Sequence, residues 1–203
     1  MHNNQIITIL GRKGSGKTYL ARYLCQSAKR LVVYDPRGNF SKCGLVVDNK
    51  NDFIRYLEQQ QNKNFRIIYQ PKFLLGQDRS VSEEHFNFVG RCIGRLKNIL
   101  FVIDEVHLFS NQKENGNMLK DFIVMGRQVG ISIISTTIRY TNVTTDMRNN
   151  SDVLISFQCQ EPSDVDYLRK RFGNLADELP TLPSYHFIMK RSDSPTATKE
   201  RPV

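Results

Sequence analysis

The sequence predicts an α/β fold in which helices cover both faces of a mainly parallel central sheet. Short β-rich apolar runs alternate with helical patterns along the 203 residues, as in chains built from successive strand–helix units. Residues 99–103 (ILFVI) are apolar at every position, which is typical of a strand buried on both faces. The length suits one domain with a sizeable core, which we place at 1–190, before a flexible basic and polar tail at 191–203.

The predicted elements follow in chain order. In the first half we expect strands at 6–10, 31–36, 44–48 and 65–70, one helix beginning near Lys17 and a second at 51–60 that is capped by Asn51 or Asp52. In the second half we expect helices at 82–98, 117–128 and 162–173 and strands at 99–105, 131–137, 153–158 and 184–190, the last at an edge of the sheet.

The composition indicates a soluble protein of a reducing compartment. Hydrophobic residues make up 39% of the chain and charged residues 24%, and no apolar run approaches the length of a membrane span. The start MHNNQ lacks the features of a signal peptide. The cysteines form no CxxC pair and are expected to be mostly buried free thiols: Cys25, Cys43, Cys92 and Cys159. We therefore expect a cytoplasmic protein that does not enter a membrane.

The net charge favours a polyanionic partner. Lysine and arginine exceed the acidic residues by nine, and the pI is about 9.5. Nucleic acid is the partner that this balance favours first.

The most specific local pattern is GRKGSGKT at residues 11–18, between an apolar run and a helical pattern. It fits the phosphate-binding loop, in which glycines let backbone N–H groups wrap phosphate oxygens at the start of a helix. Lys17 is expected to reach the β- and γ-phosphates of ATP, and the Thr18 hydroxyl to bind Mg²⁺. The predicted nucleotide-binding residues are Gly11, Arg12, Lys13, Gly14, Ser15, Gly16, Lys17, Thr18 and Tyr19.

Two acidic residues follow the buried apolar run. Asp104 and Glu105 stand at the end of a predicted strand, where carboxylates are costly unless they bind a cation or take part in chemistry. In phosphoryl transfer, an Asp at this position holds Mg²⁺ and a Glu after it can polarise the attacking water. The pair therefore predicts hydrolysis of the nucleotide, with Glu105 as the catalytic residue.

The same stretch reads DEVH, from Asp104 to His107, and resembles a DExH helicase box. His107 is interpreted either as a residue that couples hydrolysis to nucleic acid or as an ordinary loop residue. A helicase of that kind needs a second domain with an arginine-rich motif, for which this chain has no room. A one-domain helicase-like protein is kept as an alternative.

Residues 126–158 resemble the HerA–FtsK superfamily of DNA-pumping ATPases. The matching features are Arg127 before Gly130, a polar cluster at 135–137, and Asn150 before a strand that ends in Phe157 and Gln158. The segment VYDPRGNF at 33–40 matches a further family segment. The likeness covers residues 5 to about 170 and is greatest for the compact viral genome-packaging ATPases. It implies a three-layer αβα P-loop NTPase fold of the RecA/FtsK-like type.

The resemblance assigns further catalytic roles. Arg127 matches an arginine finger that completes the site of a neighbouring subunit; the alternative is a solvated cation at a helix end. Ile138 stands where the family commonly has a glutamine, so sensing of the γ-phosphate falls to Thr136 or Thr137, of which we take Thr137 as the catalytic candidate.

Two arginines flank the polar loop after residues 131–137. Arg139 and Arg148 are interpreted either as contacts to DNA phosphates or as solvent-facing charges, whereas the run 169–171 is interpreted as a solvated helix face.

The predicted function is an ATP-hydrolysing motor that translocates double-stranded DNA during viral genome packaging. If the chain is viral, the expected location is the host cytoplasm or the virion. The resemblance implies a homo-oligomeric ring of about five or six subunits, with capsid or portal-vertex proteins as further partners. The alternatives are the helicase-like protein and an ATP-binding assembly or morphogenesis switch without processive work.

Overall fold

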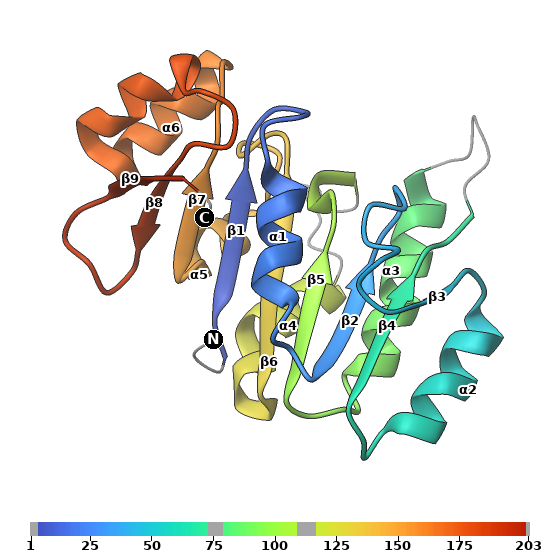
Figure 1. The fold of residues 1–203 in the computed structure, drawn as a ribbon. Helices are drawn as coiled ribbons and strands as arrows, with labels where there is room; N and C mark the ends of the chain where they lie inside the picture. The colour runs from blue at the N-terminus through green and yellow to red at the C-terminus, as the bar shows by residue number, and fades with distance from the viewer. Residues whose placement is uncertain (1–3, 73–78, 109–116, 202–203) are drawn as a thin grey trace.

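The computed structural model describes residues 4–72, 79–108 and 117–201, which form one twisted sheet with helices on both faces (Figure 1). Nine strands of this part of the chain are hydrogen-bonded in the order β3-β4-β2-β5-β6-β1-β7-β8-β9. The strands are β1 (Ile6–Leu10), β2 (Arg30–Tyr34), β3 (Leu45–Val47), β4 (Phe65–Tyr69), β5 (Ile99–Ile103), β6 (Ile131–Thr137), β7 (Val153–Ser156), β8 (Phe187–Arg191) and β9 (Thr198–Glu200).

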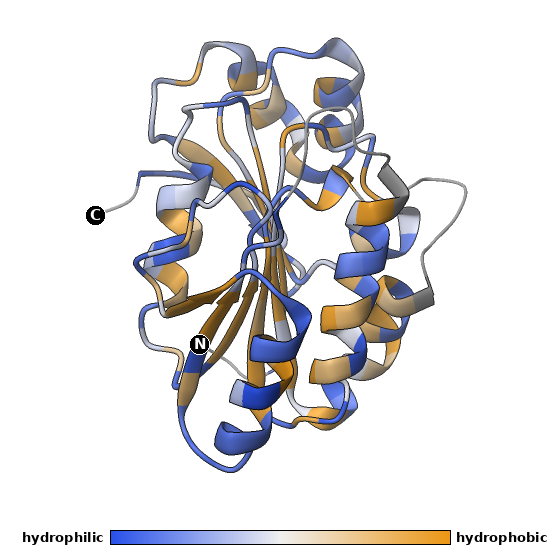
Figure 2. Cartoon of the chain, turned by 90° about the vertical axis from the view of Figure 1, so that its right-hand side faces the viewer, coloured by the Kyte–Doolittle hydropathy of each residue, from blue (hydrophilic) through white to orange (hydrophobic). Residues whose placement is uncertain are grey.

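The seven strands from β3 to β7 in this order are parallel, and β8 and β9 are antiparallel. Helix α1 (Lys17–Cys25) packs on one face, against Ile7 and Ile9 of β1. The opposite face is covered by α2 (Lys50–Gln60), α3 (Arg79–Ile93), α4 (Asn117–Met125) and α5 (Thr145–Asn150). Figure 2 shows the apolar strands enclosed between these layers. The predicted three-layer αβα fold is confirmed.

The parallel order brings the ends of distant segments together. Leu10 pairs with Thr137, and Ile103 pairs with Ser135, so β1, β5 and β6 end at the same edge of the sheet. The loop after β1 and the acidic pair after β5 therefore meet there, although more than eighty residues separate them in the chain. We call this the nucleotide edge.

The C-terminal part differs from the prediction. The segment 184–190 was expected to supply an edge strand and 191–203 a flexible tail, but Thr198–Glu200 pairs antiparallel with β8. The backbone N–H and C=O groups on the free side of β8 form hydrogen bonds with this polar segment, because strand pairing depends on backbone groups and needs no apolar side chain. Lys199 also forms an ion pair with Glu178 of the 3₁₀ helix η3 (Gly173–Thr181), at 2.5 Å.

Several helix bounds also differ. Helix α3 ends at Ile93 rather than at residue 98, and Asn49, not Asn51 or Asp52, caps α2 by accepting the N–H of Asp52 at 2.9 Å. The predicted helix at 117–128 ends as α4 at Met125 and continues as the 3₁₀ helix η2 (Gly126–Val129). Short helices such as α5 give too few residues for a periodic pattern to be recognised.

Two further observations concern the cysteines and the possibility of a membrane span. Cys25 and Cys159 are buried free thiols, whereas Cys43 and Cys92 are half-buried free thiols. No helix within the described ranges is both long enough and apolar enough to cross a bilayer.

Candidate active site

The loop between β1 and α1 has a backbone that only glycine adopts easily. Gly11, Gly14 and Gly16 have φ values of 154°, 78° and 117°. A Cβ on Gly11 would lie 2.7 Å from the Cβ of Phe157, so the loop also passes too close to the residue that follows β7 to carry a side chain there. No side chain among the described residues caps α1, which begins at Lys17. The N–H groups at this helix start are therefore available to an anion.

Lys17 lies at the centre of this loop. Its side chain is buried, and Nζ donates a hydrogen bond to the carbonyl oxygen of Arg12 at 3.0 Å. Burial lowers the pKa of Lys17, while the nearby carboxylates of Glu105 and Asp104 raise it. Lys17 is thus close enough to both acidic residues for their charges to act on it.

The polar groups beside Lys17 fit a phosphate. The Oγ of Ser15 is buried and has no hydrogen-bond partner among the described residues, which is costly unless a ligand supplies one. Thr18 is half-buried, whereas Arg12, Lys13 and Gly14 are exposed. The loop accordingly combines free backbone donors, a buried cation and an unpaired hydroxyl, which together suit the triphosphate of a nucleotide.

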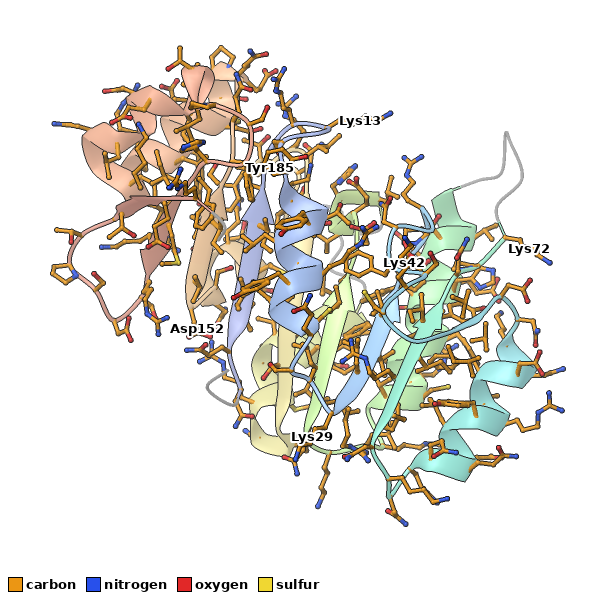
Figure 3. The ribbon with its side chains drawn as sticks, in the orientation of Figure 1. Lys13, Lys29, Lys42, Lys72, Asp152 and Tyr185 are labelled. Carbon is orange, nitrogen blue, oxygen red and sulfur yellow. The ribbon has the colours of Figure 1, made fainter. Side chains whose placement is uncertain are left out.

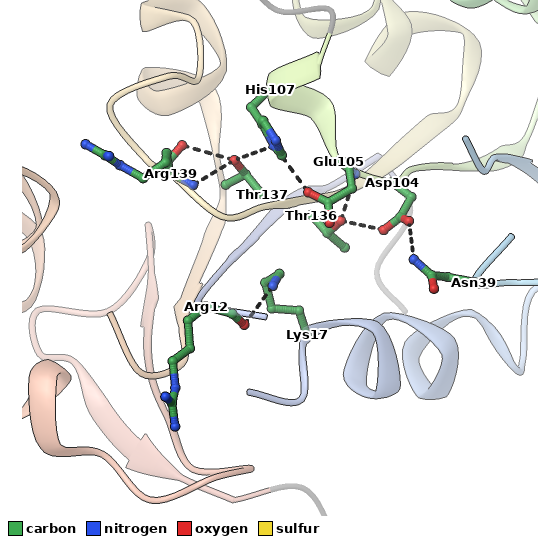
Figure 4. Close-up of polar contacts among 9 residues, drawn as sticks. All are labelled: Arg12, Lys17, Asn39, Asp104, Glu105, His107, Thr136, Thr137 and Arg139. Carbon is green, nitrogen blue, oxygen red and sulfur yellow. Dashed lines mark hydrogen bonds and ion pairs between the residues drawn. The ribbon is translucent and has the colours of Figure 1, made fainter. Parts of the chain in front are cut away.

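Asp104 is held from two sides at the end of β5 (Figure 4). Its Oδ1 accepts a hydrogen bond from the hydroxyl of Thr136 on β6 at 2.7 Å, and its Oδ2 accepts one from Nδ2 of Asn39 at 2.9 Å. The side chain is buried. These two donors fix the orientation of the carboxylate.

Asn39 is placed by a tight turn after β2 that the sequence analysis did not assign to the site. The buried carboxylate of Asp35 accepts the N–H groups of Asn39 and Phe40, at 2.8 and 2.7 Å. Burial raises the pKa of Asp35, and these backbone donors oppose the rise. The strand-end Asp in VYDPRGNF, which matched the family segment, was the available sequence signal for this turn.

Glu105 has an unusual backbone. Its φ is 54°, in the left-handed region, and its N–H donates to the Thr136 hydroxyl oxygen at 3.0 Å. Burial and Asp104 raise the pKa of Glu105, whereas Lys17 and Arg37 lower it. A non-glycine residue in this conformation at a strand end is often part of a functional site.

His107 contacts both Glu105 and Thr137. Its Nδ1 lies 3.3 Å from Oε2 of Glu105 and 3.5 Å from Oγ1 of Thr137. The first contact has the distance of an ion pair but no hydrogen-bond geometry, so this buried oxygen accepts no hydrogen bond within the described part of the chain. Thr137 also donates to the carbonyl oxygen of Arg139 at 3.0 Å. Thr136 thus orients the acidic pair, and Thr137 lies beside His107.

The expected Mg²⁺ ligands, Thr18 and Asp104, belong to the two segments that meet at this edge. The described residues contain no group of three or more His, Cys, Asp or Glu side chains that could bind a metal by themselves. This donor set fits an ion that takes its remaining ligands from phosphate and water, which is the usual arrangement for Mg²⁺.

Two exposed tyrosines flank the loop. Tyr19 is 51% exposed and Tyr185 is 53% exposed, and their rings meet edge to face with centroids 6.2 Å apart. The N–H of Tyr185 donates to the carbonyl oxygen of Ser15 at 3.0 Å, which ties the segment before β8 to the loop. Tyr185 was not predicted, because it lies more than 160 residues from the loop in sequence.

Arg127 lies at the opposite edge of the sheet. Its guanidinium donates to Oδ2 of Asp152 at 2.9 Å, and the same carboxylate oxygen accepts the N–H of Ile6 at the start of β1. Figure 3 places Asp152 and the loop residue Lys13 at opposite ends of the sheet. Arg127 therefore does not reach the nucleotide edge of its own chain.

Arg139 and Arg148 are engaged within the chain. Arg139 Nε donates to Oδ2 of the buried Asp164 at 2.9 Å. The Arg148 guanidinium lies over the ring of Tyr167, 4.6 Å from its centroid. Both arginines were expected in solvent or on DNA, and the structure gives each an internal partner on α6 (Pro162–Phe172). Within 169–171, Arg169 is paired with Asp166 and Asp177.

Comparison with known proteins shows which family the chain matches in sequence and which solved structures it resembles in fold. Residues 1–139 match the family model described as AAA domain, and no curated protein matches the chain. Among solved structures, the chain is similar to the genome packaging NTPase B204 from Sulfolobus turreted icosahedral virus 2 in complex with ATP-gammaS, at 20% identity over 100% of both chains with a TM-score of 0.76.

Two further solved structures are also similar in fold. VirB4 of Thermoanaerobacter pseudethanolicus is 10% identical over 98% of this chain and 90% of that chain, with a TM-score of 0.77. The bacterial conjugative coupling protein TrwBdeltaN70 is 13% identical over 96% and 85% of the two chains, with a TM-score of 0.66. At these identities the likeness establishes the fold, and the expected resemblance to viral genome-packaging ATPases is confirmed at that level. Because the family model spans residues 1–139 of 203, including the phosphate loop and the acidic pair, the chain belongs to the AAA domain family of P-loop ATPases.

Proposed function

We propose that this P-loop ATPase is a motor that translocates double-stranded DNA, in the manner of a viral genome-packaging ATPase. The observation that carries the proposal is the position of Glu105, fixed in a left-handed conformation beside Asp104 and close enough to Lys17 to affect its pKa. A nucleotide-binding switch has no need of a half-buried glutamate held in this way. The compact chain, similar in fold over its whole length to a genome packaging NTPase, supports translocation as the work done.

Particular residues of the chain are assigned to nucleotide binding, proton transfer, metal binding and γ-phosphate sensing. Lys17 and the loop N–H groups bind the phosphates, and Tyr19 with Tyr185 offers aromatic surface for the base. Glu105 accepts the proton of the attacking water through a carboxylate oxygen that takes no hydrogen bond from the described residues. Thr18 and Asp104 would hold Mg²⁺, which supplies charge neutralisation at the β- and γ-phosphates when bound. Thr137, beside His107, is the proposed sensor of the γ-phosphate.

Arg127 is proposed to act on a neighbouring subunit. It lies at the edge opposite to its own Lys17, so a head-to-tail contact would bring it to the nucleotide edge of the next copy. Val124 and Met125, just before it, are 57% and 54% exposed, and such apolar side chains suit a subunit contact. Closing this contact gives a ring of about five or six subunits, in the cytoplasm, with capsid or portal-vertex proteins as further partners.

The test measures ATP hydrolysis and assembly mass with and without duplex DNA. We expect ATP to promote a ring, duplex DNA to raise turnover, and a DNA-tracking assay to detect movement without strand separation. Strand separation would favour the helicase-like alternative. An ATP hydrolysis rate that is the same with and without duplex DNA would contradict the proposed motor function and favour an assembly switch.

A further inference from the structure

The N-terminal ends of three neighbouring strands form a second charged edge, opposite to the nucleotide edge. The chain reaches β2, β4 and β5 through residues 26–30, 61–64 and 94–98. These strands are adjacent in the order β4-β2-β5 and are parallel, so the three segments lie side by side. Figure 3 places Lys29 at this end of the sheet.

The three segments carry only positive charges. They contain no Asp or Glu, and their cations, which we call the basic edge, are Lys29, Arg30, Lys63, Arg95 and Lys97. All are exposed except Arg30, which is half-buried. The remaining polar side chains are amides and a serine: Gln26, Ser27, Gln61, Asn62, Asn64 and Asn98.

Arg30 holds this edge together. Its guanidinium donates to the carbonyl oxygen of Lys63 at 2.6 Å and to that of Lys97 at 3.2 Å, and it lies 4.8 Å from the centroid of the Phe65 ring. The backbone of Lys29 also accepts the N–H of Phe65 at 3.0 Å. The arginine therefore fixes the three segments and leaves the lysine ammonium groups facing outward without an ion pair among the described residues.

The surface between these side chains is hollowed rather than flat. A hollow of about 420 Å³ is lined by Arg30, Arg95 and Lys97 together with neighbouring amides. A second hollow, of about 330 Å³, is lined by Lys29, Asn64 and Asn98 among others. Cations and amides around shallow hollows are the groups that contact phosphate oxygens of a nucleic-acid backbone.

We infer that the basic edge binds the phosphate backbone of duplex DNA, and this inference rests on the proposed function. Three strands spaced about 4.8 Å apart span about 10 Å, which faces about three phosphates of one DNA strand. A protein partner fits less well, because protein interfaces are depleted in Lys and enriched in aromatic residues. None of the exposed large apolar side chains of the described residues lies in these three segments.

This assignment moves the DNA contact away from the loop at 139–148. The arginines of that loop hold Asp164 and Tyr167, whereas the lysines of the basic edge have no competing partner in the described chain. The basic edge lies at the same end of the sheet as Arg127, because the N–H of Asn98 donates to the carbonyl oxygen of Val129. Arg127 is paired with Asp152 just before β7, whereas the basic edge lies at the starts of β4, β2 and β5. The proposed DNA contact is therefore next to the proposed subunit contact and does not include Arg127.

The test compares two triple variants with the same loss of charge. The edge variant carries Lys29→Gln, Lys63→Gln and Lys97→Gln. The control variant carries Lys42→Gln, Lys120→Gln and Lys170→Gln, three exposed lysines that lie outside the edge and have no ion pair among the described residues. The assay measures affinity for a random-sequence duplex between 50 and 300 mM salt, with ATP binding and assembly mass as checks on folding and ring formation.

We expect the edge variant to lose about 0.9 in salt slope for each phosphate contact removed, up to about 2.7, and at least about tenfold in affinity at 100 mM salt. The control variant should keep the wild-type slope. Equal salt slopes for the two variants would overturn the inference and leave the proposed motor function unaffected. A loss of DNA binding that arises only because the edge variant fails to assemble would also overturn the inference. A wild-type protein that binds ATP and assembles but ignores DNA would overturn both proposals.

Discussion

Thr136 donates a hydrogen bond from its hydroxyl to Oδ1 of Asp104 at 2.7 Å, and both side chains are buried. The same hydroxyl oxygen accepts the N–H of Glu105 at 3.0 Å. One side chain on β6 therefore positions both acidic residues at the end of β5, one through its carboxylate and the other through its backbone. This relationship makes Thr136 the positioning residue of the acidic pair, next to the sensor candidate Thr137.

Replacing Thr136 by Val should lower ATP hydrolysis by about 10- to 100-fold while ATP binding persists, because the acidic pair loses its orientation. The free energy of unfolding should also fall by about 1–3 kcal/mol, since two buried polar groups lose their partner. Thr136→Ser keeps the hydroxyl and serves as the control, with most activity retained. Wild-type turnover in Thr136→Val would show that the hydroxyl does not position the acids.

The nucleotide site should fail in two distinguishable ways. Lys17→Ala removes the buried cation that neutralises the β- and γ-phosphates, so we expect loss of both ATP binding and turnover. Glu105→Gln keeps the shape and most contacts but cannot accept a proton, so binding should survive while hydrolysis falls by about 10² or more. Nucleotide-binding titrations beside turnover assays check both. A Glu105→Gln protein with normal turnover would mean that another group activates the water.

Two thiols should resist modification at neutral pH. Burial is the main cause that raises the pKa of Cys25 and of Cys159 to about 11 each. Because the thiolate is the reactive form, its fraction at pH 8 is about 10⁻³ and grows as the pH approaches 11. Alkylation of the native protein followed by mass spectrometry should therefore find both cysteines protected, and unfolding should expose them. Rapid labelling of either thiol in the native protein at pH 8 would contradict this.

Arg139 should matter for stability and not for DNA. Removing it leaves the carboxylate of Asp164 buried without its cation, although Asp164 Oδ1 keeps the N–H of Thr141 at 2.8 Å. Arg139→Ala is therefore expected to lower the free energy of unfolding by about 1–3 kcal/mol, measured by chemical denaturation. Arg139→Lys should recover part of the loss. An unchanged unfolding midpoint combined with a smaller salt slope for DNA would restore Arg139 as a DNA contact.

The features that were predictable from sequence are those encoded locally. The bounds of β1 and β6 agree with the prediction, because each is a continuous β-rich run that ends at a glycine or a polar cluster. The phosphate loop was recognisable from eight consecutive residues, and Asp104 from its position after a buried run. In each case, the signal and the structure lie in the same short stretch of chain.

What could not be predicted depends on contacts between distant segments. Asn39 reaches Asp104 across 65 residues, and Arg139 reaches Asp164 across 25. No periodic pattern encodes such a pairing. The basic edge is likewise divided among three segments, each with only one or two cations, so that its charge is concentrated only after the strands pair. Strand β9 was missed because its polar residues gave no apolar alternation.

The last prediction concerns Arg127, because the proposed ring depends on it. Arg127→Ala protein should bind ATP, since Arg127 lies at the far edge of its own chain, yet hydrolyse ATP poorly because the neighbour's γ-phosphate loses a cation. An arginine supplied in this way is worth about 10³ to 10⁵ in rate. Arg127→Lys is the matched variant that keeps the charge but not the planar donor geometry, and should recover little activity.

Mixing experiments distinguish this role from a local one. Glu105→Gln protein keeps Arg127, and Arg127→Ala protein keeps Glu105, so a mixed ring contains some contacts in which an intact Glu105 site meets an intact Arg127. Under conditions where subunits exchange, the ATPase rate plotted against mixing ratio should pass through a maximum above either pure protein. A flat, inactive curve despite confirmed mixed rings would rule out the trans arginine. Full activity of Arg127→Ala alone would do the same and would leave the Arg127–Asp152 pair as a structural contact between η2 and the start of β7.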